Sequence, residues 1–499
     1  MAAGLCFDRG SESTLDSGIA DQEKSIKGLE LFNWILFFVL LWALVVIPGL
    51  FVIWLNRRYR EERWDWEWTD TTEVEFPENF LWGVATSAHQ VEGNCTHNNW
   101  WAWEHSKTPQ GESRIKTGEA SGNACEHWNR YGEDIEHIVE LGCNAYRFSI
   151  EWSKVEPAEN QFDQAALDHY KAVIRALRQQ GIEPMVTLHH FTNPLWFEKL
   201  GAFEKKKNIP YFVRFAEKVF DELQDQVTYW CTINEPSVYA TMGYFRGEFP
   251  PGKRNIRKTG IVLKNLLEAH VQVYVALKKR TGGAEAKIGL VKNLTQFDPV
   301  HRNSLPDWIV ARTLHNAFNS AVFRFLKTGR FRFSLLGTTL VRHHNHNAPQ
   351  SNDFIGLNYY SHFNVKFSFT KGFAFQLHKD DVPTDMGYAI YPEGIYRALH
   401  ETAHLGLPII ITENGIADKR DDRRFLFIRT YLYAVSRAIE EGVDVRGFFY
   451  WSLMDNFEWA EGYAMKFGLY AVNFETQERT LRTGSEAYRM AIRDATREA

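Results

Sequence analysis

Cysteine is scarce in this sequence and forms no pattern. The 499 residues include five cysteines, at Cys6, Cys95, Cys125, Cys143 and Cys231. None of them belongs to a Cys-x-x-Cys pair or stands at a zinc-ligand spacing from histidine. This argues against both a disulfide framework and a zinc site. We expect reduced, buried thiols in a domain that faces the cytosol.

The chain also lacks an excess of positive charge. Its 57 Lys and Arg residues against 62 Asp and Glu give a net charge of −5. Nucleic-acid-binding proteins present a basic face to the phosphate backbone, so nucleic acid is not expected as a partner. Aromatic residues, by contrast, reach 15%. Beside carboxylates, their rings can form platforms for the C–H faces of sugars.

The N-terminal part differs from the rest of the chain. Residues 1–30 are polar and without periodicity, and we expect them to be disordered. An uncharged run from Trp34 to Leu55 follows, within a predicted transmembrane helix over 31–56. This run is long enough to span a hydrocarbon core of about 30 Å. A cleavable signal peptide fits poorly, because the run is too long and begins too far from Met1. A buried core helix is the other alternative.

Flanking charges predict the orientation of this helix. Four arginines, Arg57, Arg58, Arg60 and Arg63, lie in a basic and aromatic juxtamembrane linker over 57–72, whereas only Lys24 and Lys27 precede the helix. The positive-inside rule then predicts a single-pass membrane protein whose C-terminal domain faces the cytosol. Two Asn-x-Thr sequons, at Asn94 and Asn293, would matter only in the opposite orientation.

From residue 73 to 499, short apolar runs alternate with amphipathic stretches, and no Pro-, Gly- or Ser-rich linker divides them. Strands are predicted at 79–87, 144–152, 183–191, 227–236, 286–295, 352–360, 407–415 and 445–456. The stretch 127–142 between the first two has apolar residues at helical spacing. Eight strands alternating with helices predict an α/β domain with a parallel sheet, closed into a (β/α)8 TIM barrel.

Polar and aromatic residues stand at the ends of most predicted strands. They are Gln90, Glu92, Arg147, Glu151, His189, His190, Asn234, Glu235, Asn358, Tyr360, Glu413, Asn414, Trp451, Glu458 and Trp459. Because the carboxyl ends of barrel strands form the active face, we expect these side chains to converge on one pocket. Each has a plainer explanation when taken alone, since a strand-end glutamate is usually a solvated loop residue.

Glu235 and Glu413, on the fourth and seventh strands, are predicted to flank one scissile bond. Glycoside hydrolysis needs one carboxyl of raised pKa to protonate the leaving oxygen and one ionised carboxylate that faces the anomeric carbon. Arg147 is expected to keep one of the two ionised. Neither a catalytic metal nor another cofactor is expected, because the histidines lack an HExxH pattern.

Six motifs in order carry a resemblance to a known family. They are "FLWGVATSAHQVEG" (80–93), "YRFSIEWSKVEP" (146–157), "TINEP" (232–236), "ITENG" (411–415), "YWSLMDNFEWAEGY" (450–463) and "FGLYAVNFETQERT" (467–480). With them the sequence resembles glycoside hydrolase family 1, the retaining β-glucosidase family. The resemblance implies hydrolysis of terminal non-reducing β-D-glycosidic bonds by double displacement through a covalent glycosyl-enzyme.

The resemblance also implies roles for single residues. Glu235 matches the general acid/base and Glu413 the nucleophile, while Arg147 and Tyr360 match the groups that orient the nucleophile. Substrate-binding positions of the family match Gln90, His190, Asn234, Asn358, Trp451, Glu458 and Trp459.

Some positions depart from the family pattern. Phe191 stands where the family often has Trp. The segment 296–351 has no family motif, and its histidine-rich "RHHNHN" (342–347) is expected to be a solvated loop rather than a metal site. Glu461 and Phe467 stand where the phosphosugar-cleaving branch has Ser and Tyr. Because a carboxylate repels phosphate, unphosphorylated β-glycosides are the expected substrates.

Two alternatives to a simple hydrolase stay open. The same site could belong to a transglycosidase or a glycolipid β-glycosidase, because the predicted helix would hold the pocket near lipid headgroups. A catalytically inactive sugar- or partner-binding protein is less favoured, since such chains usually lose one of the two glutamates. The expected partners are a β-glycoside or glycolipid and a lipid bilayer. The sugar preference and the oligomeric state are not predicted.

Overall fold

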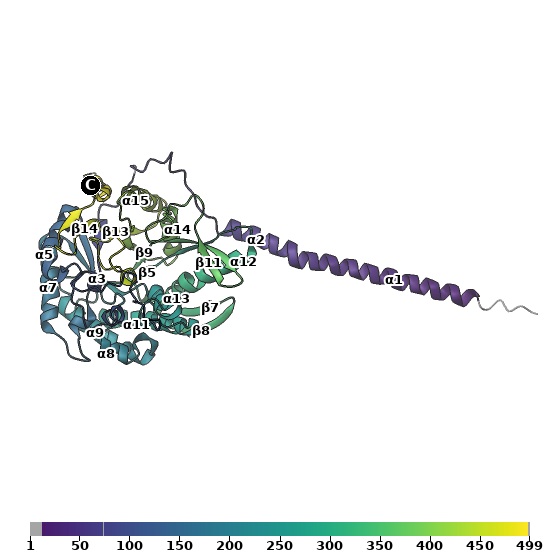
Figure 1. Ribbon diagram of the computed structural model, residues 1–499, viewed down its shortest axis with the longest axis horizontal. Helices are drawn as coiled ribbons and strands as arrows, with labels where there is room; N and C mark the ends of the chain where they lie inside the picture. The colour runs from purple at the N-terminus through teal and green to yellow at the C-terminus, as the bar shows by residue number, and fades with distance from the viewer. Residues whose placement is uncertain (1–11, 73, 498–499) are drawn as a thin grey trace, which may run out of the picture. The chain divides into compact units, whose positions relative to one another are not determined.

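The computed structural model describes residues 12–72 and 74–497, which form two compact units (Figure 1). One unit comprises the described residues up to Glu61 together with His301–Ile309. The other comprises Glu62–Val300 and the chain from Val310 onward.

The first unit is built on one helical stretch. It consists of α1 (Glu12–Leu41), the π-helical turn η1 (Trp42–Val46) and α2 (Ile47–Arg58). The portion Gly18–Arg58 is long and apolar enough to cross a membrane. The π-helical turn directly precedes Pro48, whose missing N–H disturbs the regular hydrogen bonding of a helix.

Residues 12–30 lie in α1, and not in the irregular chain expected from their polarity. Extending an existing helix requires no new nucleation, so a polar segment can continue the helix of the neighbouring apolar run. The remainder of the stretch expected to be disordered, residues 1–11, lies outside the described residues.

The carboxyl end of α2 packs against the segment His301–Ile309. The Asn56 side chain donates to the backbone oxygen of Arg302 at 2.8 Å and accepts from Arg302 Nε at 3.0 Å. Val52 and Leu55 bury their side chains with Trp308. Part of the segment that lacks a family motif therefore covers the end of the apolar helix.

The second unit confirms the predicted barrel. Its strands are β1 (Leu81–Ala85), β2 (Ala145–Ser149), β3 (Glu183–Thr187), β4 (Tyr229–Asn234), β5 (Lys287–Asn293), β9 (Phe354–Asn358), β12 (Ile409–Asn414) and β13 (Val445–Trp451). They form a closed parallel barrel in the order β1-β13-β12-β9-β5-β4-β3-β2. All eight predicted strands are present, each within its expected range.

A helix follows each barrel strand along the chain, and these helices lie outside the strands (Figure 1). They are α5 (His127–Glu140), α7 (Gln164–Gln179), α9 (Ile209–Leu223), α11 (Ile256–Lys278), α13 (Ala321–Thr328), α14 (Glu393–Ala403), α15 (Arg424–Glu440) and α16 (Glu486–Arg497). Further helices lie between these elements along the chain: α3 (Ala88–Val91), α4 (Asn99–Glu104), α6 (Trp152–Val155), α8 (Leu195–Lys199), α10 (Pro236–Thr241) and α12 (Leu305–His315).

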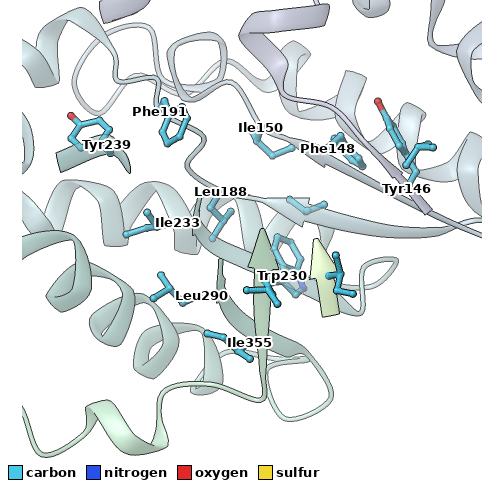
Figure 2. Packing of buried hydrophobic residues seen from close by; sticks show 14 of the residues in the cluster. Tyr146, Phe148, Ile150, Leu188, Phe191, Trp230, Ile233, Tyr239, Leu290 and Ile355 are labelled. Carbon is cyan, nitrogen blue, oxygen red and sulfur yellow. The ribbon is translucent and has the colours of Figure 1, made fainter. Parts of the chain in front are cut away.

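Successive strand residues alternate between two apolar layers, as the two-residue period of a strand requires. Met185, Cys231 and Val291 pack inside the barrel. Leu290 and Ile355 belong to the layer between strands and helices, part of which Figure 2 shows. The outer layer fixes the helices, and the inner layer fills the barrel below its carboxyl-terminal mouth.

Additional strands follow the barrel strands. β6 (Gln296–Pro299), β10 (His362–Ser368) and β11 (Gly372–Gln376) form one small sheet, β7 (Arg330–Leu335) and β8 (Thr338–His344) a second, and β14 (Tyr470–Val472) and β15 (Arg479–Leu481) a third. The expected loop at 342–347 is thus wrong for its first residues, which lie in β8. There His343 Nε2 lies 2.6 Å from Glu268 Oε1, so a hydrogen bond holds the strand to α11.

Two further expectations concern the linker and the cysteines. Within the second unit, Trp64 N–H and Trp66 Nε1 donate to Glu393 Oε1 at 2.7 and 3.1 Å, so this part of the linker is fixed on α14.

The four described cysteines are free and buried, as predicted. Cys6 lies outside the described residues.

Candidate active site

Glu235 directly follows the carboxyl end of β4. Its backbone adopts the left-handed region, at φ 45° and ψ 61°, which is costly for a glutamate and typical of functional sites. Its N–H donates to Val291 O at 2.9 Å. Pro236 does not merely stop the strand, as its missing N–H alone would indicate. It is the first residue of α10, where the fixed φ of proline favours a helix start.

The Glu235 carboxyl accepts hydrogen bonds from two amides. Asn358 Nδ2 and Asn293 Nδ2 lie 2.8 and 3.0 Å from the same oxygen, Oε1. Burial raises the pKa of Glu235 to about 7, and the charge of Glu413 acts in the same direction. The two amides act against this rise. Near neutral pH the Glu235 carboxyl therefore exists in both its protonated and its ionised form, and it can donate or accept a proton.

Glu413, on β12, has different neighbours. Arg147 Nη1 lies 2.5 Å from its Oε1, and the Tyr360 hydroxyl donates to its Oε2 at 2.7 Å. The Arg147 side chain is fully buried. Although burial acts to lower the pKa of Arg147, the Glu413 charge raises it above its ordinary value. The second carboxyl thus lies in a cationic, hydrogen-bonded environment.

Asn234 and His190 extend this network. Asn234 Oδ1 accepts from Arg147 Nη2 at 2.8 Å, and Asn234 Nδ2 lies 3.0 Å from His190 Nε2. Burial and the nearby Arg147 hold the pKa of His190 well below its usual range, so the ring is neutral and Nε2 accepts. Its Nδ1 is buried and has no hydrogen-bond partner among the described residues, which leaves a donor for a bound hydroxyl.

The remaining predicted residues come from the first and eighth strands. Gln90 Nε2 donates to Glu458 Oε2 at 3.2 Å. The His190 ring stacks on Trp451 and Trp459, with centroids 5.7 and 6.0 Å away. Burial raises the pKa of Glu458 to about 8, helped by the Glu413 charge. Contacts therefore join all eleven predicted site residues into one cluster of carboxyls, amides and indoles.

Four other strand-end residues lie in separate contacts. Glu92 binds Lys154 Nζ at 2.8 Å, and Glu151 caps the short helix α6. His189 Nε2 lies 2.9 Å from Asn193 Oδ1, and Asn414 donates to a backbone oxygen at 2.6 Å. These four residues make structural contacts, and because Glu92 and Glu151 are buried they are not the solvated loop residues that a strand-end glutamate usually is.

Asn293 was singled out from the sequence only as a glycosylation sequon. The structure buries its side chain against Glu235, so this asparagine is inaccessible to a glycan, whereas Asn94 is exposed. Strand alternation could have found it, because Asn293 lies two residues after Val291 and faces the same way. Phe191, at the position where the family often has Trp, packs edge-on against His190 with centroids 5.2 Å apart.

One group of described residues has the composition of a metal site. Ligand atoms of His89, Cys95 and Glu151 lie within 4.8 Å of one another, and all three residues are buried. Burial raises the pKa of the Cys95 thiol well above its ordinary value, although the nearby Lys154 ammonium acts to lower it. A neutral thiol beside an ammonium is a poor ligand set for a divalent cation.

Comparisons with known proteins agree with this geometry. The family model described as glycosyl hydrolase family 1 matches residues 72–496. The β-glucosidase A of Thermotoga maritima is 34% identical over 445 residues, which cover 84% of this chain and 98% of that protein. The β-galactosidase of Pyrococcus woesei is 31% identical, over 82% of this chain and 95% of that protein. The solved structure of a β-glycosidase from Pyrococcus horikoshii is 40% identical with a TM-score of 0.76, over 85% and 96% of the two chains.

Proposed function

The chain belongs to glycosyl hydrolase family 1, and from this premise we propose that it is a membrane-anchored, retaining β-glycosidase in which Glu413 is the nucleophile and Glu235 the general acid/base. The observation that carries the assignment is the contrast between the two carboxyls. Glu413 contacts a buried guanidinium and a phenol, whereas Glu235 is bonded by neutral amides and has a pKa raised to about 7. One group is built to stay charged and the other to exchange a proton.

In the first step, a Glu413 oxygen attacks C1 of the sugar from the face opposite the leaving group. The bond between C1 and the glycosidic oxygen breaks while Glu235 gives that oxygen its proton. The products are a covalent glycosyl-enzyme and a free alcohol. Asn234, held by Arg147, is oriented to donate to the sugar 2-hydroxyl as positive charge develops on the ring.

In the second step, the ionised Glu235 takes a proton from water, and the water oxygen attacks C1. The bond between C1 and Glu413 breaks, so both carboxyls return to their starting states. Glu235 can serve as base because glycosylation neutralises the Glu413 charge. That charge is one of the two causes that raise its pKa in the free enzyme.

Azide rescue separates the two roles. With an activated aryl β-glucoside, Glu413→Gly should be inactive until azide replaces the missing nucleophile, and the product should be the inverted α-glycosyl azide. Glu235→Ala should form the glycosyl-enzyme and give the retained β-glycosyl azide. Glu222→Gln, on the outer helix α9 where Lys171 and Lys218 bind the carboxylate, serves as the control. Wild-type turnover in either site variant would refute the assignment.

We propose unphosphorylated β-glucosides and β-galactosides as substrates. Glu461 carries a carboxylate bound to Lys116 at 2.5 Å, and Phe467 is a buried ring beside Tyr360 that offers no hydroxyl. Neither favours a sugar phosphate. Comparing p-nitrophenyl β-glucoside, β-galactoside and β-glucoside 6-phosphate tests this. Faster cleavage of the phosphorylated sugar would contradict it.

We further propose that the helix over 31–56 spans a membrane and that residues 73–499 act on its cytosolic side. The side chains of Gly18–Arg58 are almost all exposed, which is costly for an apolar helix in water. Arg57 and Arg58 lie in the last turn of α2, at the end of the helix that precedes the barrel along the chain. The full chain should stay in membranes after carbonate extraction, and protease should reach the barrel only in inside-out vesicles. Release by carbonate would refute the anchor.

A second candidate function, cleavage or transfer of a sugar on a lipid-like alcohol, rests on an aromatic track beside the site. β6 and β10 follow the carboxyl ends of β5 and β9, so their sheet continues from the active face. Burial raises the pKa of Tyr388, and the charges of Glu458 and Glu235 act in the same direction. From Tyr388 the rings of Phe363, Phe375 and Phe373 follow at centroid distances of 6.5, 4.5 and 5.4 Å.

The far end of this track is unusually exposed. Beyond Phe373, its cross-strand partner Phe367 lies 4.8 Å from the ring of Phe369, which is in the turn between β10 and β11 and is 95% exposed. Phe375, within the track, is 40% exposed. A hydrocarbon chain that leaves the sugar along these rings would bury apolar surface, at about 0.8 kcal/mol or fourfold in kcat/KM for each methylene. The track thus favours alkyl or acyl aglycones over small polar ones.

Alkyl β-glucosides of increasing length, used below their micelle concentrations, test this second candidate. We expect kcat/KM to rise with chain length in the wild type and to rise less in the Phe369→Ser, Phe375→Ser double variant. Trp68→Ser, at an exposed ring ahead of β1, is the control. A lipid alcohol added as acceptor should yield a transfer product. Equal kcat/KM for all chain lengths would refute the apolar aglycone site.

A further inference from the structure

A buried lysine interrupts the apolar outer side of β5. Ile288 and Leu290 point into the layer between strands and helices, whereas Val291 points into the barrel. Lys292 continues the outward series and is fully buried. Its neighbour Asn293 points the other way and holds Glu235. A charged side chain at such a position is costly unless it is compensated, so it calls for a role.

The Lys292 ammonium has specific partners. Nζ donates to the backbone oxygen of Asn293 and lies 3.2 Å from Asn319 Oδ1. It also lies 4.4 Å from the centroid of the Phe318 ring, within the range of a cation–π contact. The lysine therefore binds both the residue that holds Glu235 and the π-helical turn η5 (Asn316–Ser320).

A chain of polar groups leads from Asn319 toward the surface. Asn319 Nδ2 lies 3.2 Å from His315 Nδ1, and His315 Nε2 lies 3.0 Å from Glu401 Oε1. The Glu401 side chain is 28% exposed. Burial acts to raise the pKa of Glu401, but His315, Arg312 and Lys292 together lower it below its ordinary value. Asn293 thus links Lys292 to Glu235, and Asn319 and His315 link it to Glu401.

The charges on both sides decide what Lys292 can do. Burial lowers the pKa of Lys292 to about 7, although Glu235 and Glu401 act to raise it. Glu235 faces Glu413, which disfavours its ionised form, and Lys292, which favours it. Lysine and glutamate therefore titrate in the same pH range, and a positive Lys292 offsets part of the repulsion between the two catalytic carboxyls.

Resting on the proposed role of Glu235, we propose that Lys292 is a positioning residue for the proton transfer. It fixes the backbone oxygen of Asn293, whose side-chain amide donates to Glu235, and its positive charge favours the ionised form of that carboxyl when the proton has left for the glycosidic oxygen. If Lys292 only filled space, replacing it by an apolar side chain of the same length would leave the proton transfer unchanged.

The pH dependence of kcat/KM tests this proposal on the full-length chain, with p-nitrophenyl β-glucoside as substrate. Lys292→Met keeps the length of the side chain and removes its charge. Without the cation, the pKa of Glu235 should rise, and the alkaline limb should move to higher pH by on the order of one unit. When each enzyme is normalised at pH 6, the variant should retain about five times more of its activity at pH 8 than the wild type.

Two further variants control the experiment. Lys292→Arg keeps the charge and should return the limb toward its wild-type position. Lys278→Met removes a lysine that donates to Ala286 O and pairs with Asp353 at the opposite end of the barrel, and should leave the limb in place. If Lys292→Met does not fold, Lys292→Gln and Asn319→Leu replace it, and each should move the limb in the same direction.

The possible failures are distinguishable. Active Lys292 variants whose alkaline limb stays at the wild-type pH would overturn the role of Lys292 and leave the proposed function intact. A wild-type chain without β-glycosidase activity, or an alkaline limb that persists in Glu235→Gln, would overturn the proposed function and this inference with it.

Discussion

Replacing Glu235 by glutamine should make the protein more stable at alkaline pH. Burial raises the pKa of this carboxyl from 4.5 to about 7. The folded state therefore holds a proton that the unfolded state releases between these two pH values. Stability falls as the pH rises through this range, because the folded state binds more protons.

The size of the effect follows from the same values. A rise in pKa from 4.5 to about 7 corresponds to about 3 kcal/mol of unfolding free energy above pH 7, and to none below pH 4.5. Glutamine has the same shape and carries no charge, so Glu235→Gln should gain up to about 3 kcal/mol over the wild type at pH 8. At pH 4 residue 235 should contribute almost equally to the unfolding free energy of the two proteins.

Urea unfolding of both proteins at pH 4, 6 and 8, followed by circular dichroism, measures this difference. Glu222→Gln is a control of opposite sign, because Lys171 and Lys218 lower the pKa of Glu222 to about 2. That variant should be less stable than the wild type at pH 7 and should lose the difference as the pH falls toward 2. A pH-independent difference between wild type and Glu235→Gln would refute the buried, protonated state of Glu235.

Three further predictions concern activity and packing. The alkaline limb of kcat/KM should lie near pH 7 for p-nitrophenyl β-glucoside and vanish in Glu235→Gln; a pH–rate profile decides this. Tyr360→Phe removes a charge-assisted hydrogen bond to Glu413 of about 1.5–3 kcal/mol, so kcat/KM should fall at least about tenfold at unchanged melting temperature; a loss under twofold would contradict the contact. Trp230→Ala empties a fully buried site beside Phe220 and should lower the unfolding free energy by about 3–5 kcal/mol in urea; a cost below 1 kcal/mol would count against the packing.

Local sequence patterns were enough to predict the barrel, and the resemblance to a family supplied the candidate site residues. Strand and helix periodicities are read from neighbouring residues, so all eight barrel strands could be placed before any tertiary contact was known. The motifs around Glu235 and Glu413 belong to strand ends, and parallel strands in one barrel bring all their carboxyl ends to one face. The parallel arrangement of the barrel strands therefore brings these residues to the same face.

The tertiary structure decided which side chains contact one another, because sequence periodicity does not encode these contacts. That Asn358 bonds Glu235, and that Tyr360, two residues later, bonds Glu413, depends on side-chain directions across three strands. In the segment 296–351, which has no family motif, β6 pairs with the sequence-distant β10 and His343 contacts Glu268, whereas β7 and β8 form a local hairpin.

The different surroundings of the two carboxyls depend on burial and on charges that come from other strands. Sequence determined which glutamates form the pair. Burial and the Glu413 charge raise the pKa of Glu235, and Arg147 contacts Glu413; these separations exist only after folding, because electrostatic interactions depend on distance in space and on solvent exposure.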